Sequence, residues 1–439
     1  MYKTKKPILL VTIQSDYVAR DFIESGVLSE LQCTFNLLFV TGTKFNLDLN
    51  PYGLVVARYS MSLWRSIVWD IAFGLRHISA LEPIIKSQDG WLQLFQRGKS
   101  RITKRITLTI NWFGISGVLS RLLEHFLSLT VTDFFNLKIT PDYALLPTGI
   151  NDPFWDDAIA LCRRKKIRSL TVTVNWDNIA SKVFLQKPDF LGVWGEQGYL
   201  FARLLQKIPA KKIVTIGAPR FVNYSKRVLS KVEARHQLQL PQGKRLLLFA
   251  GCGVVFDEVS LVEEFEEACR NGNLENDLFL IYKPHPKRHK RAAEPILRPS
   301  EYRYVKVFHE DGLTSLEKYP VLFSAVEGVI SPFSTMLLES ALMGLPALAL
   351  AYEDINHGEY PWNSVRMTNH IHPMLDQRWV VQCFERNGYL QAVRELLKKV
   401  GDSQVEEIAK QVSRFIIHED NATYGKRVSD VFLRKISEN

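Results

Sequence analysis

The chain has few cysteines, and they are widely spaced. The five are Cys33, Cys162, Cys252, Cys269 and Cys383, and no two of them form a CxxC pair. An odd number of distant cysteines argues against a disulfide framework and against a cysteine-rich zinc site. The cysteine pattern therefore predicts a protein of a reducing cytosol.

Long hydrophobic runs are also missing. No stretch of about 18 consecutive apolar residues occurs, which argues against a transmembrane helix. The apolar run at 7–13, PILLVTI, is short and is not followed by a small-residue cleavage site. We interpret it as a first β-strand rather than a signal peptide. The expected location is the cytoplasm, with the inner face of the plasma membrane as a further expectation.

Several familiar catalytic motifs have no convincing counterpart. We find no HExxH metal site, no DxD pair and no Ser-His-Asp order, and the glycines at 251–253 match neither GxGxxG nor GxxxxGK[ST]. The pair Asp156-Asp157 lies inside a predicted helix and is interpreted as surface. We therefore expect a protein without a dedicated metal ion or a bound cofactor.

What is present is the composition of a globular protein with a basic excess. The 439 residues are 46% hydrophobic and 23% charged, and the net charge is +10. This length predicts two domains, each able to bury a core. The basic excess favours anionic partners, which include phosphorylated substrates, an anionic membrane surface and nucleic acid.

Strand-like and helix-like segments alternate along the chain. This β-α-β rhythm predicts parallel sheets with helices on both faces. A polar break at 221–244 contains Pro241-Gln242-Gly243, and we place the domain boundary there. The expected fold class is α/β, with two doubly wound Rossmann-like domains at 1–235 and 236–439 and a cleft between them. The end of the chain is expected to be helical.

The most informative stretch is 329–350, VISPFSTMLLESALMGLPALAL. It predicts a buried strand, a polar turn, a helix and a second buried strand. Ser331, Ser334 and Thr335 fall at the start of this helix, where free backbone N–H groups and the helix dipole favour a phosphate. An ordinary helix N-cap is the alternative interpretation. Glu339 lies one turn beyond Thr335 on the same face, where it is placed to bind ribose hydroxyls or lies on the helix surface.

A second anion-binding element precedes it. Lys283-Pro284-His285-Pro286 ends the predicted strand LFLIY, and the two prolines stiffen the backbone around His285. An imidazole held there is suited to a phosphate oxygen. Gly251 and Gly253 follow another buried strand, where they permit close approach of a ligand or form a plain tight turn. Ligands of parallel sheets bind at the carboxyl ends of the strands.

The first half contributes candidates for a second substrate. Asn175, Trp176, Asp177 and Asn178 follow the predicted strand SLTVTV. Asp177 is a candidate base toward an acceptor hydroxyl, and the neighbouring residues are candidate acceptor contacts. A structural Asx-turn is the alternative. Asp16, after the first strand, is a second candidate base.

Further candidates are weaker. Glu196, in the segment VWGEQG, is an additional acceptor contact, and residues 309–311 are candidates for reading a base or ribose. The stretch 101–135 mixes Arg and Lys with aromatic and apolar residues, so it is able to form an amphipathic helix. Packing against the sheet is the ordinary role of such a helix. Contact with an anionic membrane or a lipid-linked acceptor is the functional alternative.

The motifs KPHP and SPFSTMLLESALMGLP, together with the two-domain rhythm, resemble glycosyltransferases of the GT-B architecture. More narrowly, they resemble the bacterial surface-polysaccharide enzymes that share a His-Pro and a Ser/Thr motif. These include CDP-glycerol glycerophosphotransferases, capsule Kdo transferases and sialyltransferase-like enzymes. The segments NWDNIASK, WGEQG and VTIGAPRF resemble the first domain of uncharacterised members. The SPFST form departs from the aspartate-led motif of the glycerophosphotransferases.

The resemblance implies residue roles and a reaction. His285, Ser334 and Thr335 are implied to bind the donor phosphates, Glu339 to lie near the donor ribose or sugar, and Gly251 with Gly253 to line the cleft. The implied reaction is metal-independent transfer of a sugar, or a polyol phosphate, from a nucleotide-activated donor. Its acceptor would be a hydroxyl of a capsular or lipopolysaccharide-type glycan or of a glycolipid.

Two alternatives remain. One is a nucleotide-sugar 2-epimerase of the same fold, which needs no acceptor. The other is a non-catalytic protein that binds nucleic acid, suggested by the positive charge. The helix-turn-helix and the basic, aromatic strand face expected of such a protein are missing, so we expect no nucleic-acid partner.

Overall fold

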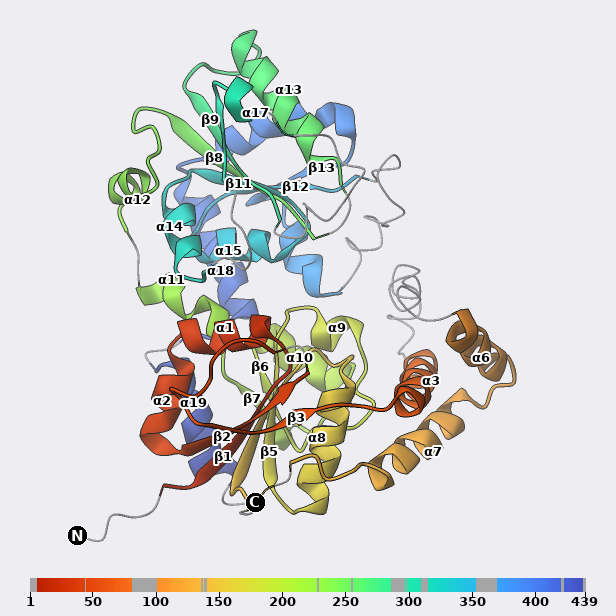
Figure 1. Ribbon diagram of the computed structural model, residues 1–439. Helices are drawn as coiled ribbons and strands as arrows, with labels where there is room; N and C mark the ends of the chain where they lie inside the picture. The colour runs from red at the N-terminus through yellow and green to blue at the C-terminus, as the bar shows by residue number, and fades with distance from the viewer. Residues whose placement is uncertain are drawn as a thin grey trace, which may run out of the picture. The chain divides into compact units, whose positions relative to one another are not determined.

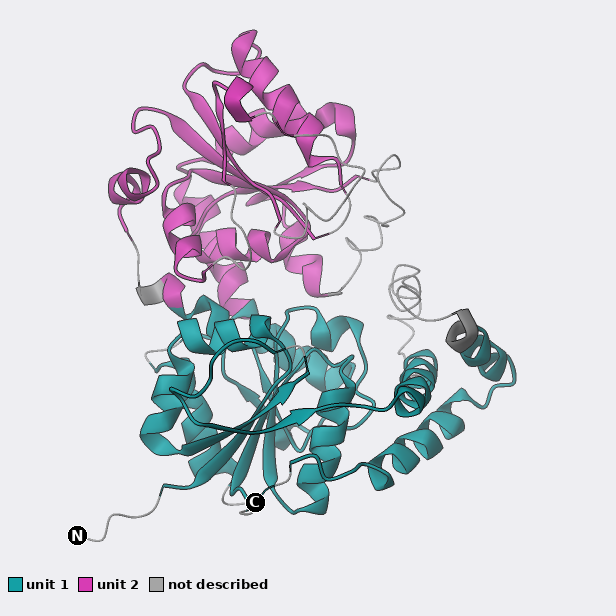
Figure 2. Cartoon of the chain, in the orientation of Figure 1, with its two compact units in different colours: residues 1–222, 416–439 teal, residues 223–415 magenta. Residues whose placement is uncertain are grey.

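A computed structural model shows two compact units (Figure 2). Unit 1 comprises residues 1–222 and 416–439, and unit 2 comprises residues 223–415. Each unit is built on its own parallel sheet, so the expected α/β class with two doubly wound domains is confirmed. The structure describes residues 6–43, 45–80, 101–135, 137, 140–226, 229–253, 256–285, 297, 299–308, 315–352, 369–419 and 422–436.

The sheet of unit 1 has seven strands in the order β3-β2-β1-β4-β5-β6-β7 (Figure 1). All of its neighbouring strands run parallel. The chain winds outward from β1 to β3, returns to the other side of β1 and continues from β4 to β7. The strands are β1 (Ile8–Ile13), β2 (Asn36–Gly42), β3 (Leu54–Tyr59), β4 (Tyr143–Thr148), β5 (Arg168–Thr173), β6 (Phe190–Val193) and β7 (Ile213–Thr215).

Helices cover both faces of this sheet because right-handed crossovers in opposite directions place helices on opposite sides. One core contains residues of α1 and α2, and the other contains residues of α8 and α10. Gly26, with φ of 80°, separates α1 from α2, where the sequence suggested one continuous helix. The helices of this sandwich are α1 (Asp16–Glu24), α2 (Val27–Thr34), α8 (Pro153–Arg164), α9 (Asn178–Ser181) and α10 (Glu196–Leu204).

Three further helices of unit 1 form an additional layer: α3 (Leu63–Ala80), α6 (Arg101–Trp112) and α7 (Ser116–Leu129). Helix α3 packs against both α6 and α7. Trp69 and Phe73 of α3 form a small core with Leu127 of α7. A buried ion pair, with Arg65 Nη2 2.5 Å from Asp157 Oδ1, joins this layer to α8. The stretch 101–135, expected to be able to form an amphipathic helix, forms the two helices α6 and α7.

The sheet of unit 2 has six parallel strands in the order β10-β9-β8-β11-β12-β13. Helices α13 (Glu258–Arg270) and α17 (Tyr389–Lys399) cover one face, and α14 (Lys318–Ser324) and α15 (Thr335–Leu342) the other (Figure 1). Helices α11 (Val222–Lys226), α12 (Lys231–Gln237) and α18 (Ser403–Ile416) complete the unit. The strands are β8 (Arg245–Ala250), β9 (Leu278–Lys283), β10 (Val305–Val307), β11 (Gly328–Pro332), β12 (Ala347–Leu350) and β13 (Val380–Cys383).

The expected assignment of residues 236–439 to one domain needs correction. The chain passes into unit 2 after residue 222, and its last residues return to unit 1. In α19 (Tyr424–Asp430) and the following helical turn, Tyr424, Val428 and Phe432 recur every four residues and lie fully within the first core of unit 1. The Phe432 ring lies 5.9 Å from that of Phe35. The segment returns because its apolar stripe completes this core.

Candidate functional site

The candidate phosphate site lies at the topological switch point of unit 2. The chain leaves β8 toward β9 and β10, whereas β11 joins β8 on its other side. The turns after β8 and β11 therefore diverge to opposite faces, and the crevice between them is where ligands of open parallel sheets bind. The carboxyl ends of β9, β8 and β11 carry the sequence-predicted residues 283–285, 251–253 and 331–335.

The glycine turn and His285 lie in direct contact. A Cβ atom on Gly251 would stand 2.9 Å from the His285 backbone nitrogen, closer than side-chain atoms ordinarily come. A Cβ on Gly253 would stand 3.4 Å from His285 Nε2. The half-buried imidazole therefore lies over the glycine turn. The two motifs, more than 30 residues apart in the sequence, are brought together as the strand-end argument predicted.

Glu258, which sequence reasoning missed, holds this turn from the protein side. It is fully buried at the start of α13. Its Oε1 accepts from the Cys252 backbone N–H at 2.8 Å, and its Oε2 accepts from the Tyr282 hydroxyl at 2.7 Å. The Gly251 N–H donates to the Lys283 carbonyl at 2.9 Å. These amides are therefore already bonded, and the turn offers room for a ligand rather than a set of open donors.

The serines after β11 form a chain of hydrogen bonds. Ser331 is fully buried, and its hydroxyl donates to the Ala250 carbonyl at 2.8 Å. The proton between Ser331 Oγ and Ser334 Oγ, which are 3.0 Å apart, therefore comes from Ser334. Ser334 is also the N-cap of α15 and accepts from the Met336 N–H at 3.2 Å. Ser331 thus orients Ser334 rather than facing a ligand itself.

Thr335 opens α15 and is half-exposed. Its backbone N–H is the first of the helix, where the intrahelical ladder supplies no acceptor. The partial positive charge of the helix end adds to this donor. Thr335 therefore offers a backbone donor at the helix end, the arrangement that suits a phosphate, whereas Ser334 acts as the helix cap.

Lys283 and Glu339 face other partners. The Lys283 ammonium is largely buried and lies 5.2 Å from the centre of the Tyr319 ring, a cation–π contact on α14. Glu339 is also buried, and its Oε2 accepts from the hydroxyl of Tyr224 on α11. The positive charge of Lys283 still acts on the strand end through space. A ribose contact by Glu339 stays a prediction.

The acceptor candidates of unit 1 form the turn after β5. Asn178 is fully buried, and its Oδ1 accepts from the Asn175 N–H at 2.9 Å, so this side chain closes the turn. Trp176 Nε1 donates to Gln197 at 2.8 Å. Asp177 keeps 40% of its side chain exposed, with Oδ2 3.6 Å from Lys182 Nζ. Of this cluster, Asp177 presents a carboxylate to solvent.

The other two carboxylates lie at different strand ends. Asp16, after β1, is half-buried, and its Oδ1 accepts from the backbone N–H groups of Asn46 and Leu47 at 2.8 and 3.3 Å. These bonds fix the loop after β2. Glu196 is exposed in the first turn of α10. Pro286 and residues 309–311, which the sequence also suggested, lie outside the described residues.

The switch point of unit 1 holds two residues that sequence reasoning missed. Gln14 and Asp152 follow β1 and β4, the pair of strands between which the chain reverses direction. Asp152 is the N-cap of α8 through its Oδ1, and its Oδ2 is buried. Desolvation by burial raises the pKa of Asp152 to about 6. A signal was available in the sequence, because Asp-Pro after an apolar run marks a helix start.

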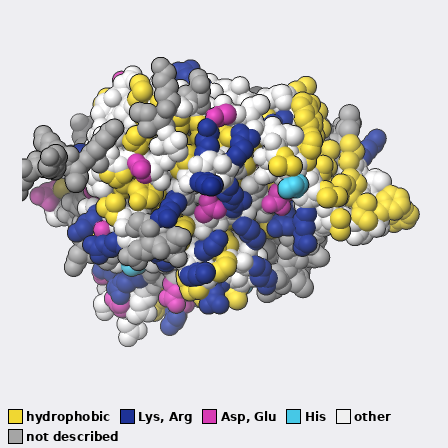
Figure 3. Space-filling view, turned by 90° about the horizontal axis from the view of Figure 1, so that it is seen from below, with side chains coloured by type: hydrophobic (Ala, Val, Ile, Leu, Met, Phe, Trp, Pro, Cys, Tyr) yellow, Lys and Arg dark blue, Asp and Glu magenta, His cyan; other side chains and the backbone are white. Residues whose placement is uncertain are grey.

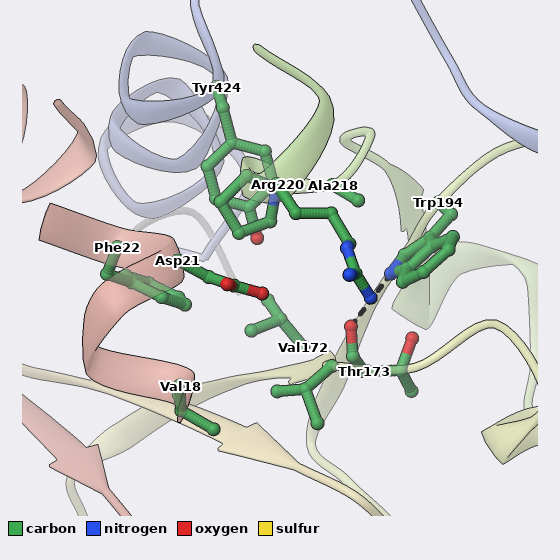
Figure 4. Close-up of a pocket in the computed structure, with 11 residues that line it drawn as sticks. Val18, Asp21, Phe22, Val172, Thr173, Trp194, Ala218, Arg220 and Tyr424 are labelled. Carbon is green, nitrogen blue, oxygen red and sulfur yellow. Dashed lines mark hydrogen bonds between the residues drawn. The ribbon is translucent and has the colours of Figure 1, made fainter. Parts of the chain in front are cut away.

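A small pocket near β5 and β6 is not a substrate site. Asp21, Trp194 and Arg220 are among the side chains that line it (Figure 4). Trp194 Nε1 donates to the Thr173 carbonyl at 2.9 Å. The pocket has a volume of about 10 Å³, which is room for roughly one water molecule. The pocket therefore belongs to the packing of α1 and α19 against the sheet.

Comparisons with known proteins identify the fold. No protein-family model matches the chain, and no curated protein matches its sequence. Solved structures do match. The glycotransferase of kitacinnamycin has a TM-score of 0.52 at 11% identity, covering 99% of this chain and 100% of that one. A protein of Listeria monocytogenes assigned as a UDP-N-acetylglucosamine 2-epimerase has a TM-score of 0.54 at 11% identity, covering 99% and 98%.

A structure of S. aureus MnaA with UDP gives a TM-score of 0.52 at 12% identity, covering 99% of each chain. These similarities extend over both units, and the parallel sheets agree with them. The chain therefore has the GT-B fold, as the resemblance of its motifs predicted. At this level of identity the fold is what the neighbours share with it.

Proposed function

We propose that this protein is a glycosyltransferase that uses a nucleotide-activated donor and binds the donor phosphates at the switch point of unit 2. The observation that supports this most directly is the convergence of His285, the glycine turn and the Ser331–Ser334 pair at the ends of three adjacent strands. The group transferred is a sugar or a polyol phosphate. The acceptor is a hydroxyl of a cell-surface polysaccharide or glycolipid.

The residues of this site have distinct tasks in the proposed reaction. Negative charge develops on the leaving phosphate as the bond to the transferred group breaks. His285 and the Thr335 N–H supply hydrogen-bond donors for that charge, with the helix dipole behind them. Such preorganised donors perform the charge stabilisation that a metal ion gives in other enzymes. Gly253 leaves space for the phosphate beside the imidazole.

A residue of unit 1 is proposed to activate the acceptor. Asp177 is preferred to Asp16, because its carboxylate is substantially exposed whereas that of Asp16 holds two backbone amides. A general base must reach the hydroxyl whose proton it takes. We expect Asp177→Asn to lower kcat while leaving nucleotide affinity unchanged, and Asp16→Asn to act mainly through stability.

Nucleotide binding tests the donor site first. In a thermal-shift panel of CMP, CDP, UDP and GDP compounds, the preferred nucleotide should raise Tm, because it binds the folded state alone. His285→Ala should weaken that nucleotide about tenfold. His372→Ala is the matched control, since His372 is an exposed histidine of the same unit outside the site. Equal affinities and transfer rates for His285→Ala and the unaltered protein would remove the donor-site assignment.

A nucleotide-sugar 2-epimerase is the second candidate, because a structure assigned to that activity shares the fold over the full chain. The two activities differ in their need for an acceptor. Incubation with UDP-N-acetylglucosamine alone, followed by chromatographic separation of the 2-epimers, distinguishes them. Formation of the epimer without acceptor would replace the transferase proposal, whereas nucleotide release only in the presence of an acceptor supports it.

A further inference from the structure

Large apolar side chains are exposed to solvent on three helices of unit 1. All lie on α3, α6, α7 or the short turn between the last two, and each is more than a third exposed. We call this set the apolar helical surface. Its members are Leu63, Trp64, Ile67, Ile106, Leu108, Trp112, Phe113, Ile115, Val118, Leu122, Phe126 and Leu129. A concentration of this kind marks an interaction site, whereas scattered exposed apolar residues do not.

Helix α7 shows that the exposure is not incidental. Val118, Leu122 and Phe126 recur every four residues along it, so they share one face. The opposite face already packs on α3 through small residues, with the Ser120 hydroxyl donating to the Ala72 carbonyl at 3.2 Å. Helix α7 therefore packs one face on α3 and leaves a second, apolar face exposed to solvent.

Aromatic contacts join parts of this surface. The ring centres of Trp64 on α3 and Phe126 on α7 are 5.8 Å apart, so the start of α3 joins the α7 stripe. At the turn between α6 and α7, Trp112 and Phe113 pack edge to face at 4.9 Å. Trp112 is 81% exposed. The corner thus presents two large rings outward.

A basic groove lies on the same unit, at the amino ends of β5, β6 and β7. It has a volume of about 370 Å³ and is lined by five cationic side chains and one carboxylate, Asp189. Two of the cations, Lys211 and Lys212, form a short 3-10 turn before β7. The other three are Arg163, Lys166 and Arg168.

The groove and the apolar helical surface adjoin. Glu124, the only acid of α7, interacts electrostatically first with Arg76 of α3 and then with Arg163 of the groove, so the groove lies near α7. Figure 3 shows the same relation: hydrophobic side chains cover a projection at one edge, beside a broad field of Lys and Arg. The projection occupies the place of α6 and α7 in Figure 1. One face of unit 1 therefore combines protruding apolar rings with a cationic field.

We propose that this face docks unit 1 on an anionic lipid bilayer. Protruding Trp, Phe and Leu residues suit insertion at the level of the lipid headgroups, and adjacent cations bind acidic phosphates. A protein partner that buried this face would have to cover both the rings and five cations, whereas an anionic bilayer offers apolar and negative groups at every point. None of the described helices has the length and apolarity needed to cross a membrane, so the contact is peripheral. The proposal does not depend on the transfer reaction.

Vesicle flotation with matched variants tests the apolar part. The double variant Val118→Ser, Leu122→Ser changes residues that are 66% and 61% exposed on α7. The control, Val232→Ser, Leu204→Ser, changes residues of the same types and the same exposed fractions on α12 and α10. With vesicles of equal parts phosphatidylcholine and phosphatidylglycerol, we expect the α7 pair to lower the partition coefficient about tenfold. The control pair should leave it unchanged.

A charge series tests the cationic part. Binding should fall on phosphatidylcholine vesicles and at high salt, because attraction to acidic headgroups contributes about fivefold per lysine near the surface. Lys211→Glu should lower binding at least that much, and Lys398→Glu, an exposed lysine of unit 2, should not. Circular dichroism and Tm establish that the variants fold.

Four results would overturn the proposal. The first is an unaltered protein that does not float with anionic vesicles. The second is equal loss of binding in the α7 pair and its control pair. The third is a change of sedimentation coefficient in the α7 pair with unchanged vesicle binding, which would assign the surface to self-association. Lys211-dependent binding of single-stranded or duplex nucleic acid, with no binding of vesicles, would likewise replace the bilayer by another anion.

Discussion

Replacing Ser331 by alanine tests whether this residue contributes to nucleotide binding or only to the stability of unit 2. The buried hydroxyl donates to the Ala250 carbonyl at 2.8 Å and accepts from Ser334, whose oxygen is 3.0 Å away. A buried neutral hydrogen bond contributes about 0.5–1.5 kcal/mol. Because the substitution removes one such bond and weakens a second, we expect the free energy of unfolding to fall by about 1–2 kcal/mol. For a unit of this size, that lowers Tm by a few degrees.

The effect on nucleotide affinity is the decisive measurement. Without Ser331 the Ser334 cap loses the bond that fixes its position, so the start of α15 and the Thr335 N–H are held less firmly. The preferred nucleotide should then bind about tenfold more weakly, which corresponds to about 1.4 kcal/mol. Ser340→Ala is the control: Ser340 is equally buried, and its hydroxyl donates to the Leu337 carbonyl at 2.7 Å. Its loss should cost similar stability and leave binding unchanged.

Urea unfolding and isothermal titration calorimetry measure the two quantities separately. The expected pattern is a stability loss in both variants and an affinity loss in Ser331→Ala alone. If Ser331→Ala binds the nucleotide as tightly as the unaltered protein while its stability is reduced, the serine pair is only a helix cap. An affinity loss of the same size in Ser340→Ala would show that general loosening of α15 is responsible.

Three further predictions concern the fold and the sites. Gly251→Ala should destabilise unit 2 by about 1–3 kcal/mol, because its Cβ would lie 2.4 Å from Glu258 Oε2, whereas Gly243→Ala, which has open space, should be close to neutral in urea unfolding. The pKa of Asp152 is raised in the folded state, so its charged form destabilises the fold. This loss of stability is absent below pH 4 and complete above pH 6. Asp152→Asn should therefore gain stability relative to the unaltered protein as pH rises from 4 to 7, by roughly 1–3 kcal/mol, and a constant difference would contradict the assignment. Phe432→Ala should cost about 3–5 kcal/mol and speed hydrogen exchange in unit 1 but not in unit 2; uniform acceleration would refute the placement of the terminal helix.

Local sequence patterns predicted the strand ends that matter most in unit 2. The stretch 329–350 forms β11, α15 and β12, with Ser334 at the N-cap, as its alternation of apolar and polar residues indicated. Such features depend on neighbours within a few residues, because helix caps and buried strands are set by local periodicity. The fold class followed from the repetition of these units along the chain.

Contacts between distant segments could not be obtained in that way. Glu258 beneath the glycine turn and Tyr224 on Glu339 depend on how helices pack across strands. Buried polar groups require partners, but the sequence does not specify which partner the packing will supply. The exposed rings of α6 and α7 could not be predicted either, since an amphipathic pattern does not reveal which face of a helix its neighbours leave exposed to solvent.

The sequence by itself determined the α/β class, the parallel strands and the position of residues 283–285 and 331–335 at strand ends, because each depends on residue type and short-range spacing. Tertiary structure decided that His285 lies over Gly253, since the order of strands in a sheet is fixed by packing of the whole unit. It also decided that the terminal helix returns to unit 1. An apolar stripe packs wherever a core accepts it, regardless of its distance along the chain.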